Sequence, residues 1–283
     1  MPAGLHARGD RGEAAPGGGL RPTAPDAVAH PAFAPYARWW VPRRDVVPPA
    51  PIEFDGWARA AKLTLPGDRP LSFRPALASR TSALAYERRI AATGVVATRA
   101  GDLHDACNAL AWLAFPGTKA TLNAIHVAGV AGSGGRRGRC RDAATLLDEY
   151  GMIVACPDTG LLDLWRAHQW RAAFWDRRDT VADRMRAVVI GHGLLAKLTA
   201  PFRSITAKVL VLPLDGAALP ADAALLAAAL DAAAAATIDA RGPAFAPEEL
   251  LALPVAALPG WDIEAAGARL YDDAAVFRPR MLG

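Results

Sequence analysis

Residues 103–126 read LHDACNALAWLAFPGTKATLNAIH, and the spacing of their apolar side chains predicts two short helices. The helices run from about His104 to Phe115 and from Thr118 to Ala128, and they meet at Pro116. Each helix carries polar side chains along one side of an otherwise apolar surface. Because polar groups are costly to bury without partners, the two stripes predict either a cleft or a hydrogen-bonded network in the core.

The polar residues of these helices are of types used in catalysis. His104 and Asn108 are four residues apart and share a helix face, while Lys119, Asn123 and His126 fall within about 60° of one another on the second helix. If the helices pack side by side, imidazole, amide and ammonium groups converge for proton transfer and oxyanion binding. In the alternative interpretation His104 caps its helix, and Lys119 and Asn123 face solvent.

A second group of charged residues lies on the helix predicted for Arg141–Glu149. Asp142 and Glu149 are two turns apart and therefore share a face. Carboxylates that meet imidazoles suit a divalent metal ion, so one such ion is the only cofactor that the sequence suggests. The alternative is a surface helix in which Arg141 and Asp148 form salt bridges.

A glycine-flanked histidine stands between a predicted strand and a short helix. Gly191-His192-Gly193 follows the apolar run Val188–Ile190 and precedes a helix that ends near Leu198. In α/β folds this is a common place for a ligand, and a helix N-terminus attracts anions. Lys197, one turn on, would assist. In the alternative, His192 only hydrogen-bonds the backbone of a turn.

The order of predicted elements favours an α/β or α+β fold, with a small central sheet, surrounding helices and a single main domain. Further helices are predicted at Trp57–Leu63, Ala83–Ala92, Leu161–Trp175 and Ala221–Ala236, and further strands at Val95–Thr98, Met152–Cys156 and Ala207–Leu212. Within the third of these helices, His168 lies on the apolar stripe, which predicts a buried structural histidine.

The chain divides into three parts by composition. Residues 1–30 are rich in Gly, Pro and Arg and are expected to be a disordered leader. Residues 31–51 alternate prolines with aromatic side chains, which indicates an extended arm that packs onto the main body; a docking surface is the alternative. Residues 52–283 form the globular domain.

Composition limits the class of protein and its partners. The 283 residues are 52% hydrophobic and 21% charged, as in a soluble protein with a large core. The net charge of +4 is a diffuse arginine surplus, which is weak evidence for nucleic-acid binding. One basic cluster, at Arg136, Arg137 and Arg139 in a glycine-rich loop, keeps a weak nucleic-acid binder as an alternative.

The remaining composition points to the cytoplasm and to no membrane partner. Three cysteines without C-x-x-C spacing exclude a disulfide framework and a zinc ribbon, and fit a reducing compartment. No secretory signal is visible. The most apolar segment, Ala223–Ala236, is dominated by alanine and interrupted by Asp231, so a soluble helix is expected there.

Familiar catalytic motifs are absent from the sequence. There is no G-x-S-x-G elbow, no Walker A loop and no H-E-x-x-H zinc motif. The glycine-rich loop at Gly132–Gly138 does not match G-x-G-x-x-G, because Arg137 stands where the final glycine is required. A nucleotide cofactor held by a standard loop is therefore not expected.

Several of these residues resemble the pattern of a bacterial family catalogued as domain of unknown function 3025. The resemblance runs from about Ala50 to the C-terminus, and it is most specific between His104 and Lys119. It is also carried by Tyr86-Glu87, Gly94 to Arg99, Arg141 to Glu149, Gly191-His192, Pro259-Gly260-Trp261 and Phe277-Arg278-Pro279. It implies a shared family fold and no established activity.

The leading hypothesis is a hydrolase that acts on a small phosphorylated or otherwise anionic substrate, by His/carboxylate acid–base or metal-assisted chemistry. The predicted catalytic residues are His104, Asp105, Asn108, Lys119, Asp148 and His192, with Asn123, Arg141 and Lys197 binding substrate and His126 and Glu149 holding a metal ion. Of these, His104 or His192 is the general base, and Asp105 or Asp148 orients it. The competing hypothesis is a non-enzymatic binding or scaffold protein with a buried polar network.

Overall fold

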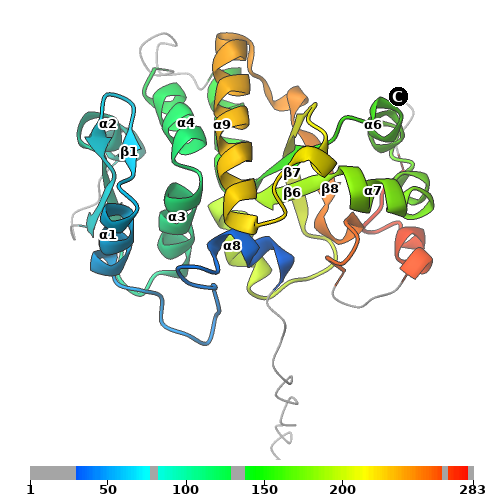
Figure 1. Ribbon diagram of the computed structural model, residues 1–283, viewed down its shortest axis with the longest axis horizontal. Coiled ribbons are helices and arrows are strands. Elements are labelled where there is room, and N and C mark those ends of the chain that lie inside the picture. The colour runs from blue at the N-terminus through cyan, green and yellow to red at the C-terminus, as the bar shows by residue number, and fades with distance from the viewer. Residues whose placement is uncertain (1–29, 77–81, 129–137, 263–266, 280–283) are drawn as a thin grey trace, which may run out of the picture.

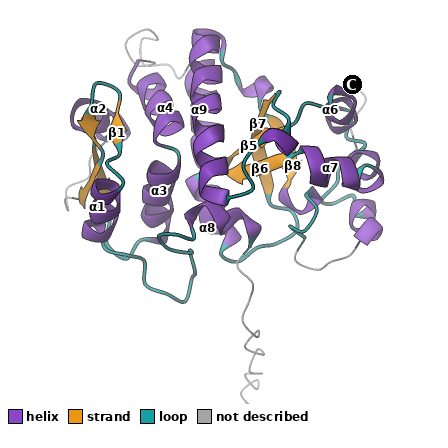
Figure 2. Cartoon of the chain, in the orientation of Figure 1, coloured by secondary structure: helices purple, strands orange, loops and turns teal. Residues whose placement is uncertain are grey.

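The computed structural model describes residues 30–76, 82–128, 138–262 and 267–279 (Figure 1). Residues 1–29 of the predicted leader and most of the basic loop, including Arg136 and Arg137, lie outside the described residues. Helices dominate the molecule, and a small sheet lies toward one side (Figure 2). This arrangement confirms the predicted mixed α/β class with a small central sheet.

The central sheet has four strands in the order β6, β5, β7, β8, with bounds Arg186–Val189, Gly151–Ala155, Thr206–Leu212 and Leu251–Pro254. β5 and β7 run parallel, whereas β6 and β8 are antiparallel to their neighbours. Every residue of β5 is buried, which explains its unbroken apolar sequence. The short β8 was not predicted.

The two helices predicted from residues 103–126 are present. They are α3 (Leu103–Ala114) and α4 (Pro116–Ala128), and Phe115 joins them. The side chain of Asp102, rather than His104, caps α3 by accepting a hydrogen bond from the Asp105 amide (3.0 Å).

The first turn of α4 is capped from far along the chain. The carboxylate of Asp231, on α9 (Ala223–Arg241), accepts hydrogen bonds from the amides of Gly117 (2.9 Å) and Thr118 (2.7 Å). Figure 1 shows α9 standing between α4 and the sheet. By length and composition α9 with its extension to Ala244 could span a membrane, but here it packs one face against α4 and the sheet.

A smaller unit covers the outer side of α4. It contains α1 (Pro51–Ala60), the hairpin β1 (Thr64–Leu65) and β2 (Arg69–Pro70), then β3 (Ser72–Pro75), α2 (Ala83–Thr93) and β4 (Val95–Thr98). β3 and β4 pair in parallel, and α2 lies against α4. α1 begins six residues before the predicted helix, because Pro51 occupies its first position.

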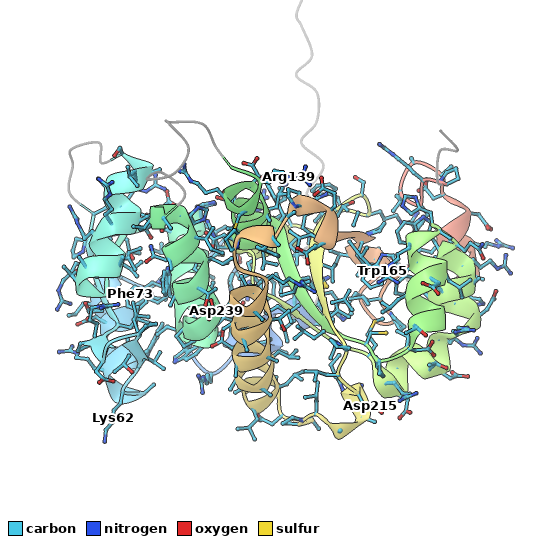
Figure 3. All side chains as sticks on the ribbon, turned by 90° about the horizontal axis from the view of Figure 1, so that it is seen from above. Lys62, Phe73, Arg139, Trp165, Asp215 and Asp239 are labelled. Carbon is cyan, nitrogen blue, oxygen red and sulfur yellow. The ribbon has the colours of Figure 1, made fainter. Side chains whose placement is uncertain are left out.

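One continuous hydrophobic core links the smaller unit to the far end of the molecule. Seen from above, its members Phe73 and Trp165 lie toward opposite ends (Figure 3). The arm predicted for residues 31–51 is part of this core, because Phe33 and Tyr36 are buried. The Tyr36 hydroxyl also donates a hydrogen bond to the carbonyl of Val189. The arm is not extended as predicted, because Pro31–Tyr36 forms the short 3-10 helix η1.

The single helix predicted for Leu161–Trp175 is wrong. The chain forms α6 (Thr159–Arg166), turns at His168, and continues as η2 (Arg171–Asp176) and α7 (Arg178–Arg184). His168 has a φ of 58°, a left-handed conformation that ends a helix. Its side chain is only partly buried, and its Nδ1 lies 3.2 Å from the Arg278 carbonyl, so the prediction of a buried core histidine is also wrong.

Candidate functional site

Most of the predicted site residues line one cavity of about 590 Å³ between α2, α3, α4, α5 (Arg139–Tyr150) and α8 (His192–Leu198). The predicted residues in its lining are His104, Asp105, Asn108, Lys119, Asn123, His126, Asp148, Glu149 and His192. The two polar stripes therefore converge as the functional interpretation required. The solvent-facing alternative is wrong for Lys119 and Asn123, which are 3% and 5% exposed.

The pairing of two strands explains how Glu149 meets His192. Glu149 lies just before β5 and His192 just after β6, and these strands are antiparallel. The register that pairs Met152 with Val189, continued by three residues, ends on Glu149 and His192. At this end of the sheet the Gly191 amide donates to the Gly151 carbonyl (2.9 Å), which holds the start of α8 against the end of α5.

An ion pair between Lys119, whose side chain is 4% exposed, and Asp148, whose side chain is 18% exposed, lines what we call the floor of the cavity. The Lys119 ammonium contacts the Asp148 carboxylate and donates to Asn108 Oδ1 (2.9 Å), and it lies 5.3 Å from the centre of the Trp112 ring. Asn108 in turn donates to the Tyr86 hydroxyl (2.9 Å). Burial opposes ionisation of Asp148, but the charges of Lys119 and His192 outweigh it and lower the Asp148 pKa.

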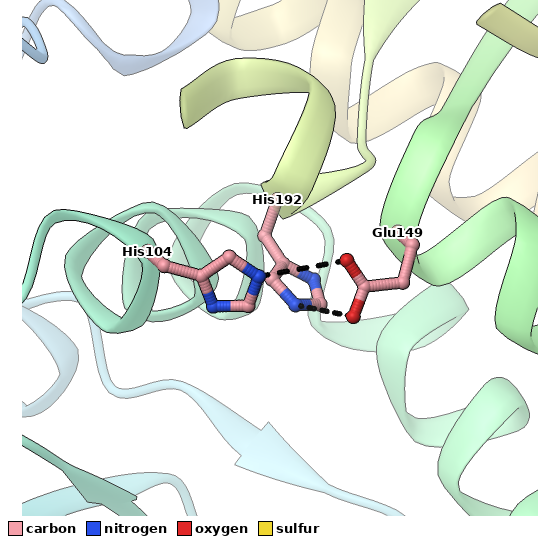
Figure 4. A group of neighbouring side chains, drawn as sticks. All are labelled: His104, Glu149 and His192. Carbon is pink, nitrogen blue, oxygen red and sulfur yellow. Dashed lines mark ion pairs between the residues drawn. The ribbon is translucent and has the colours of Figure 1, made fainter. Parts of the chain in front are cut away.

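Glu149 lies between two histidines beside this floor. Its carboxylate oxygens are 3.5 Å from His104 Nε2 and 3.4 Å from His192 Nε2. Figure 4 draws both contacts as dashed lines. The imidazole rings have centroids 4.5 Å apart. Hydrogen bonding to Glu149 raises the pKa of His104, and the two histidines lower the pKa of Glu149. His104 is 47% exposed, whereas His192 is 7% exposed.

Asp105 does not orient a histidine, although it lines the cavity. Its carboxylate accepts hydrogen bonds from the Arg99 guanidinium (2.8 and 2.9 Å) and the Arg99 amide (2.7 Å). Burial opposes ionisation of Asp105, but these bonds outweigh it and lower its pKa. Of the two acids predicted to orient a histidine, Asp148 is the one that lies near one, with its Oδ2 3.7 Å from His192 Nδ1.

Two predicted binding residues lie elsewhere. Arg141 is on α5 but does not line the cavity. Lys197 lines a neighbouring hollow of about 550 Å³ that shares His104 and Glu149 with the cavity, and its ammonium lies 4.4 Å from the Tyr150 ring centre. His126 lines the cavity but is not among the side chains grouped around Glu149.

Residues of α2 complete the cavity and were not predicted as site residues. Tyr86, Glu87 and Arg89 line it, and the Asn123 side-chain amide donates to both the backbone carbonyl (2.9 Å) and the carboxylate (2.6 Å) of Glu87. Burial raises the pKa of Glu87, and the bond from Asn123 only partly offsets this. The sequence did offer one indication of their role, because Tyr86 and Glu87 are among the residues that carry the family resemblance.

The raised pKa of Glu87 predicts a pH dependence of stability. The folded protein holds the Glu87 proton more tightly than the unfolded chain, so this contribution is complete below pH 4.5 and is lost as pH rises through the folded-state pKa. Each tenfold difference in proton affinity corresponds to about 1.4 kcal/mol. Glu87→Gln should therefore gain stability relative to the natural protein between about pH 4.5 and pH 7, as measured by urea unfolding at each pH.

The comparison isolates Glu87 because the other charged groups that face it stay in both proteins. These are Asp148 on α5, Lys119 on α4 and His192 on α8. Glu53→Gln, which alters an exposed carboxylate on α1, is the matched control. A stability difference for Glu87→Gln that does not change with pH would contradict the prediction.

Comparison with known proteins agrees with the resemblance seen in the sequence. No curated protein and no solved structure matches the chain. The family described as "Protein of unknown function (DUF3025)" matches residues 71–281, which include the whole cavity lining. Since this match covers most of the 283 residues, the chain belongs to the DUF3025 family.

Proposed function

We propose that the protein is a hydrolase whose active site is the cavity between α3, α4, α5 and α8, and that its substrate is phosphorylated or otherwise anionic. The observation that carries the proposal is the Glu149 carboxylate held between His104 and His192 at the cavity wall. A carboxylate that orients a partly exposed imidazole is the usual arrangement of a general acid–base pair.

In this proposal His104 transfers the proton. Its raised pKa increases the protonated fraction near neutral pH, so the ring can donate to a leaving-group oxygen. The neutral ring then accepts a proton from the attacking water, which restores its protonated form. Glu149 fixes the ring by its contact with Nε2, and the buried His192 supports Glu149 from the other side.

Donor groups in the same cavity favour an anionic substrate. Arg89 lines the cavity and makes no salt bridge within the described part of the chain. The Tyr86 hydroxyl accepts a hydrogen bond from Asn108, so its own proton is available for a hydrogen bond to substrate. Lys119 is committed to Asp148 and Asn108, so its role in this proposal is to hold the floor of the site. Three free cysteines support a reducing, cytoplasmic setting.

The test is hydrolysis of a small panel by the natural protein and one pair of variants. The panel contains 4-nitrophenyl phosphate, bis(4-nitrophenyl) phosphate and pyrophosphate. We expect turnover of at least one compound, a loss of about 10²–10⁴-fold in His104→Ala, and full activity in His168→Asn. The second variant removes a histidine outside the cavity, and asparagine tolerates its positive φ.

Either of two results would contradict the hydrolase proposal. One is an inert natural protein on the whole panel, and the other is an unchanged rate in His104→Ala. The cavity would then be better explained as a binding site in a scaffold protein. That second candidate has its own support, since Lys119, Asp148, Asn108 and Tyr86 form a connected and largely buried polar network.

A further inference from the structure

Three side chains from three helices bring one ligand atom each to a single place beside the cavity. They are His104 at the start of α3, Glu149 near the end of α5, and His192 at the start of α8. Their ligand atoms all lie within 4.8 Å of one another. In Figure 4 the Glu149 carboxylate faces the Nε2 edge of both rings.

The spacing of these atoms suits a shared metal ion. The distances from the Glu149 oxygens to His104 Nε2 and His192 Nε2 are 3.5 and 3.4 Å. Two ligands that each bind a zinc ion at about 2.1 Å with tetrahedral geometry are about 3.4 Å apart. Two imidazoles and one carboxylate are also a donor set of catalytic zinc sites, which leave a further position for water or substrate.

An independent observation concerns the other nitrogen of His192. This side chain is 7% exposed, and its buried Nδ1 has no hydrogen-bond partner among the described residues. Oδ2 of Asp148 lies 3.7 Å from this nitrogen. Histidines that bind a metal through Nε2 commonly direct the Nδ1 proton to a carboxylate, and Asp148 is held by Lys119 in the position for that role.

The charge of the cavity also favours a cation. Its lining contains four carboxylates but only three lysine and arginine side chains. Asp105 and Asp148 are paired with Arg99 and Lys119, so Glu149 is the carboxylate beside the histidines that a divalent ion would neutralise, and the ion would leave positive charge there for an anionic substrate. A metal ion thus reconciles this wall with the anionic substrate of the proposed function.

A second acidic group nearby is a weaker candidate. Asp102, Asp105 and His104 also lie close together, but both of these carboxylates are paired with Arg99, at 3.1 and 2.8 Å. Their charge is already neutralised by a guanidinium. The Glu149 carboxylate has no arginine or lysine partner among the described residues, and its contacts are the two histidines.

We propose that His104, Glu149 and His192 bind one divalent transition-metal ion of the zinc class, with Asp148 supporting His192. The proposal rests on the proposed function and deepens it, because such an ion would supply an acidic metal-bound water to a hydrolase. It also changes the role of His104, since a ring that binds the ion through Nε2 is a ligand, and the metal-bound water then takes over the proton transfer. It replaces the pair predicted from sequence, in which His126 accompanied Glu149, by a set in which His104 and His192 flank Glu149.

The test is titration of the full chain with zinc ions alone. Protein freed of metal by a chelator is titrated with Zn²⁺ in a calorimeter, and the metal content is then measured by elemental mass spectrometry after gel filtration. We expect one equivalent of zinc. Glu149→Gln and His192→Ala should each weaken binding by more than the 10–100-fold typical of losing a supporting residue.

Asp102→Asn is the matched control, because asparagine still caps α3 while the second acidic group loses a carboxylate. It should bind zinc like the natural protein. Gly193→Ala is a further probe, since a Cβ there would lie 2.6 Å from Glu149 Oε2 and would displace the carboxylate without removing a ligand. We expect this variant to fold, by circular dichroism, and to bind zinc at least tenfold more weakly.

Different experimental results would contradict the metal site and the hydrolase proposal. Absence of stoichiometric zinc, or binding that survives His192→Ala and is lost in Asp102→Asn, would overturn the metal site. Turnover that persists after complete chelation would overturn the role of the ion in the reaction, while leaving the hydrolase proposal intact. Stoichiometric zinc in a protein that hydrolyses nothing on the panel would support the metal site and overturn the hydrolase.

Discussion

Lys119→Met is expected to lower the free energy of unfolding by about 3–5 kcal/mol. The Lys119 side chain is 4% exposed, and its ammonium contacts Asp148 and Asn108. Methionine preserves most of the volume but leaves the Asp148 carboxylate in the cavity floor without its cation. The Asp148 side chain is only 18% exposed, and an unpaired charge that is largely buried is more costly than a lost hydrogen bond between neutral groups. Urea unfolding monitored by tryptophan fluorescence measures the loss.

The double variant Lys119→Met/Asp148→Leu separates the cost of an orphaned charge from the value of the pair. Replacing both partners by apolar residues is expected to recover most of the lost stability, as for other buried pairs. Lys197→Met, at an exposed lysine on α8, is the control and should cost less than about 1 kcal/mol. Equal losses in Lys119→Met and Lys197→Met would contradict the argument.

The double variant also distinguishes the two candidate functions. If the network serves chemistry, a stable Lys119→Met/Asp148→Leu protein should lose turnover, because His192 then lacks the Asp148 carboxylate beside its Nδ1. If the network only fixes the packing of α3 against α4, the restored fold should restore whatever binding the natural protein has.

Gly191→Ala is expected to destabilise the fold by more than about 3 kcal/mol, beyond the usual cost of overpacking. A Cβ at this position would lie 2.3 Å from the Gly151 amide nitrogen and 2.7 Å from the Glu149 carbonyl oxygen. Both are backbone atoms at the junction of α5 and β5, so neither can swing aside as a flexible side chain would. The φ of −65° suits any residue, and the requirement for glycine is therefore one of space alone.

Gly56→Ala is the matched control for this prediction. Gly56 lies within α1, and a Cβ there would have no neighbour within 4 Å. Alanine should be neutral or stabilise the protein by about 0.5–1 kcal/mol, because it favours the helix. Thermal unfolding of both variants, followed by circular dichroism, makes the comparison. A Gly191→Ala protein as stable as Gly56→Ala would show that the α5–β5 junction is not as tightly packed as described.

The local parts of the site could be predicted from the sequence. The 3.6-residue spacing of apolar side chains located α3 and α4, and it placed Asn108 and Lys119 on converging stripes. The glycines around His192 marked the start of α8. These features depend on neighbours within a few residues, which is the range over which periodicity carries information.

The pairings between distant segments could not be predicted in this way. Glu149 meets His192 only because β5 and β6 are antiparallel in a particular register, and no local pattern fixes that register. Similarly, the sequence left Asp105 and Asp148 as alternatives for orienting a histidine, and it could not show that Arg99 contacts both oxygens of Asp105. The predicted pairing of His126 with Glu149 depended on the same kind of information, because a helix face shows direction but not which partner lies opposite; His126 does line the cavity.

The family match begins at residue 71, yet the folding unit begins earlier. Phe33, Tyr36 and Phe54 precede the match and are all buried in the common core. Burying three such side chains contributes about 5–9 kcal/mol, comparable with the whole net stability of a domain. The Tyr36 hydroxyl also holds the Val189 carbonyl, three residues before His192. The segment that the family shares therefore contains the whole cavity lining, while residues outside it pack against the same core. A boundary drawn from sequence similarity alone would divide one continuous hydrophobic core.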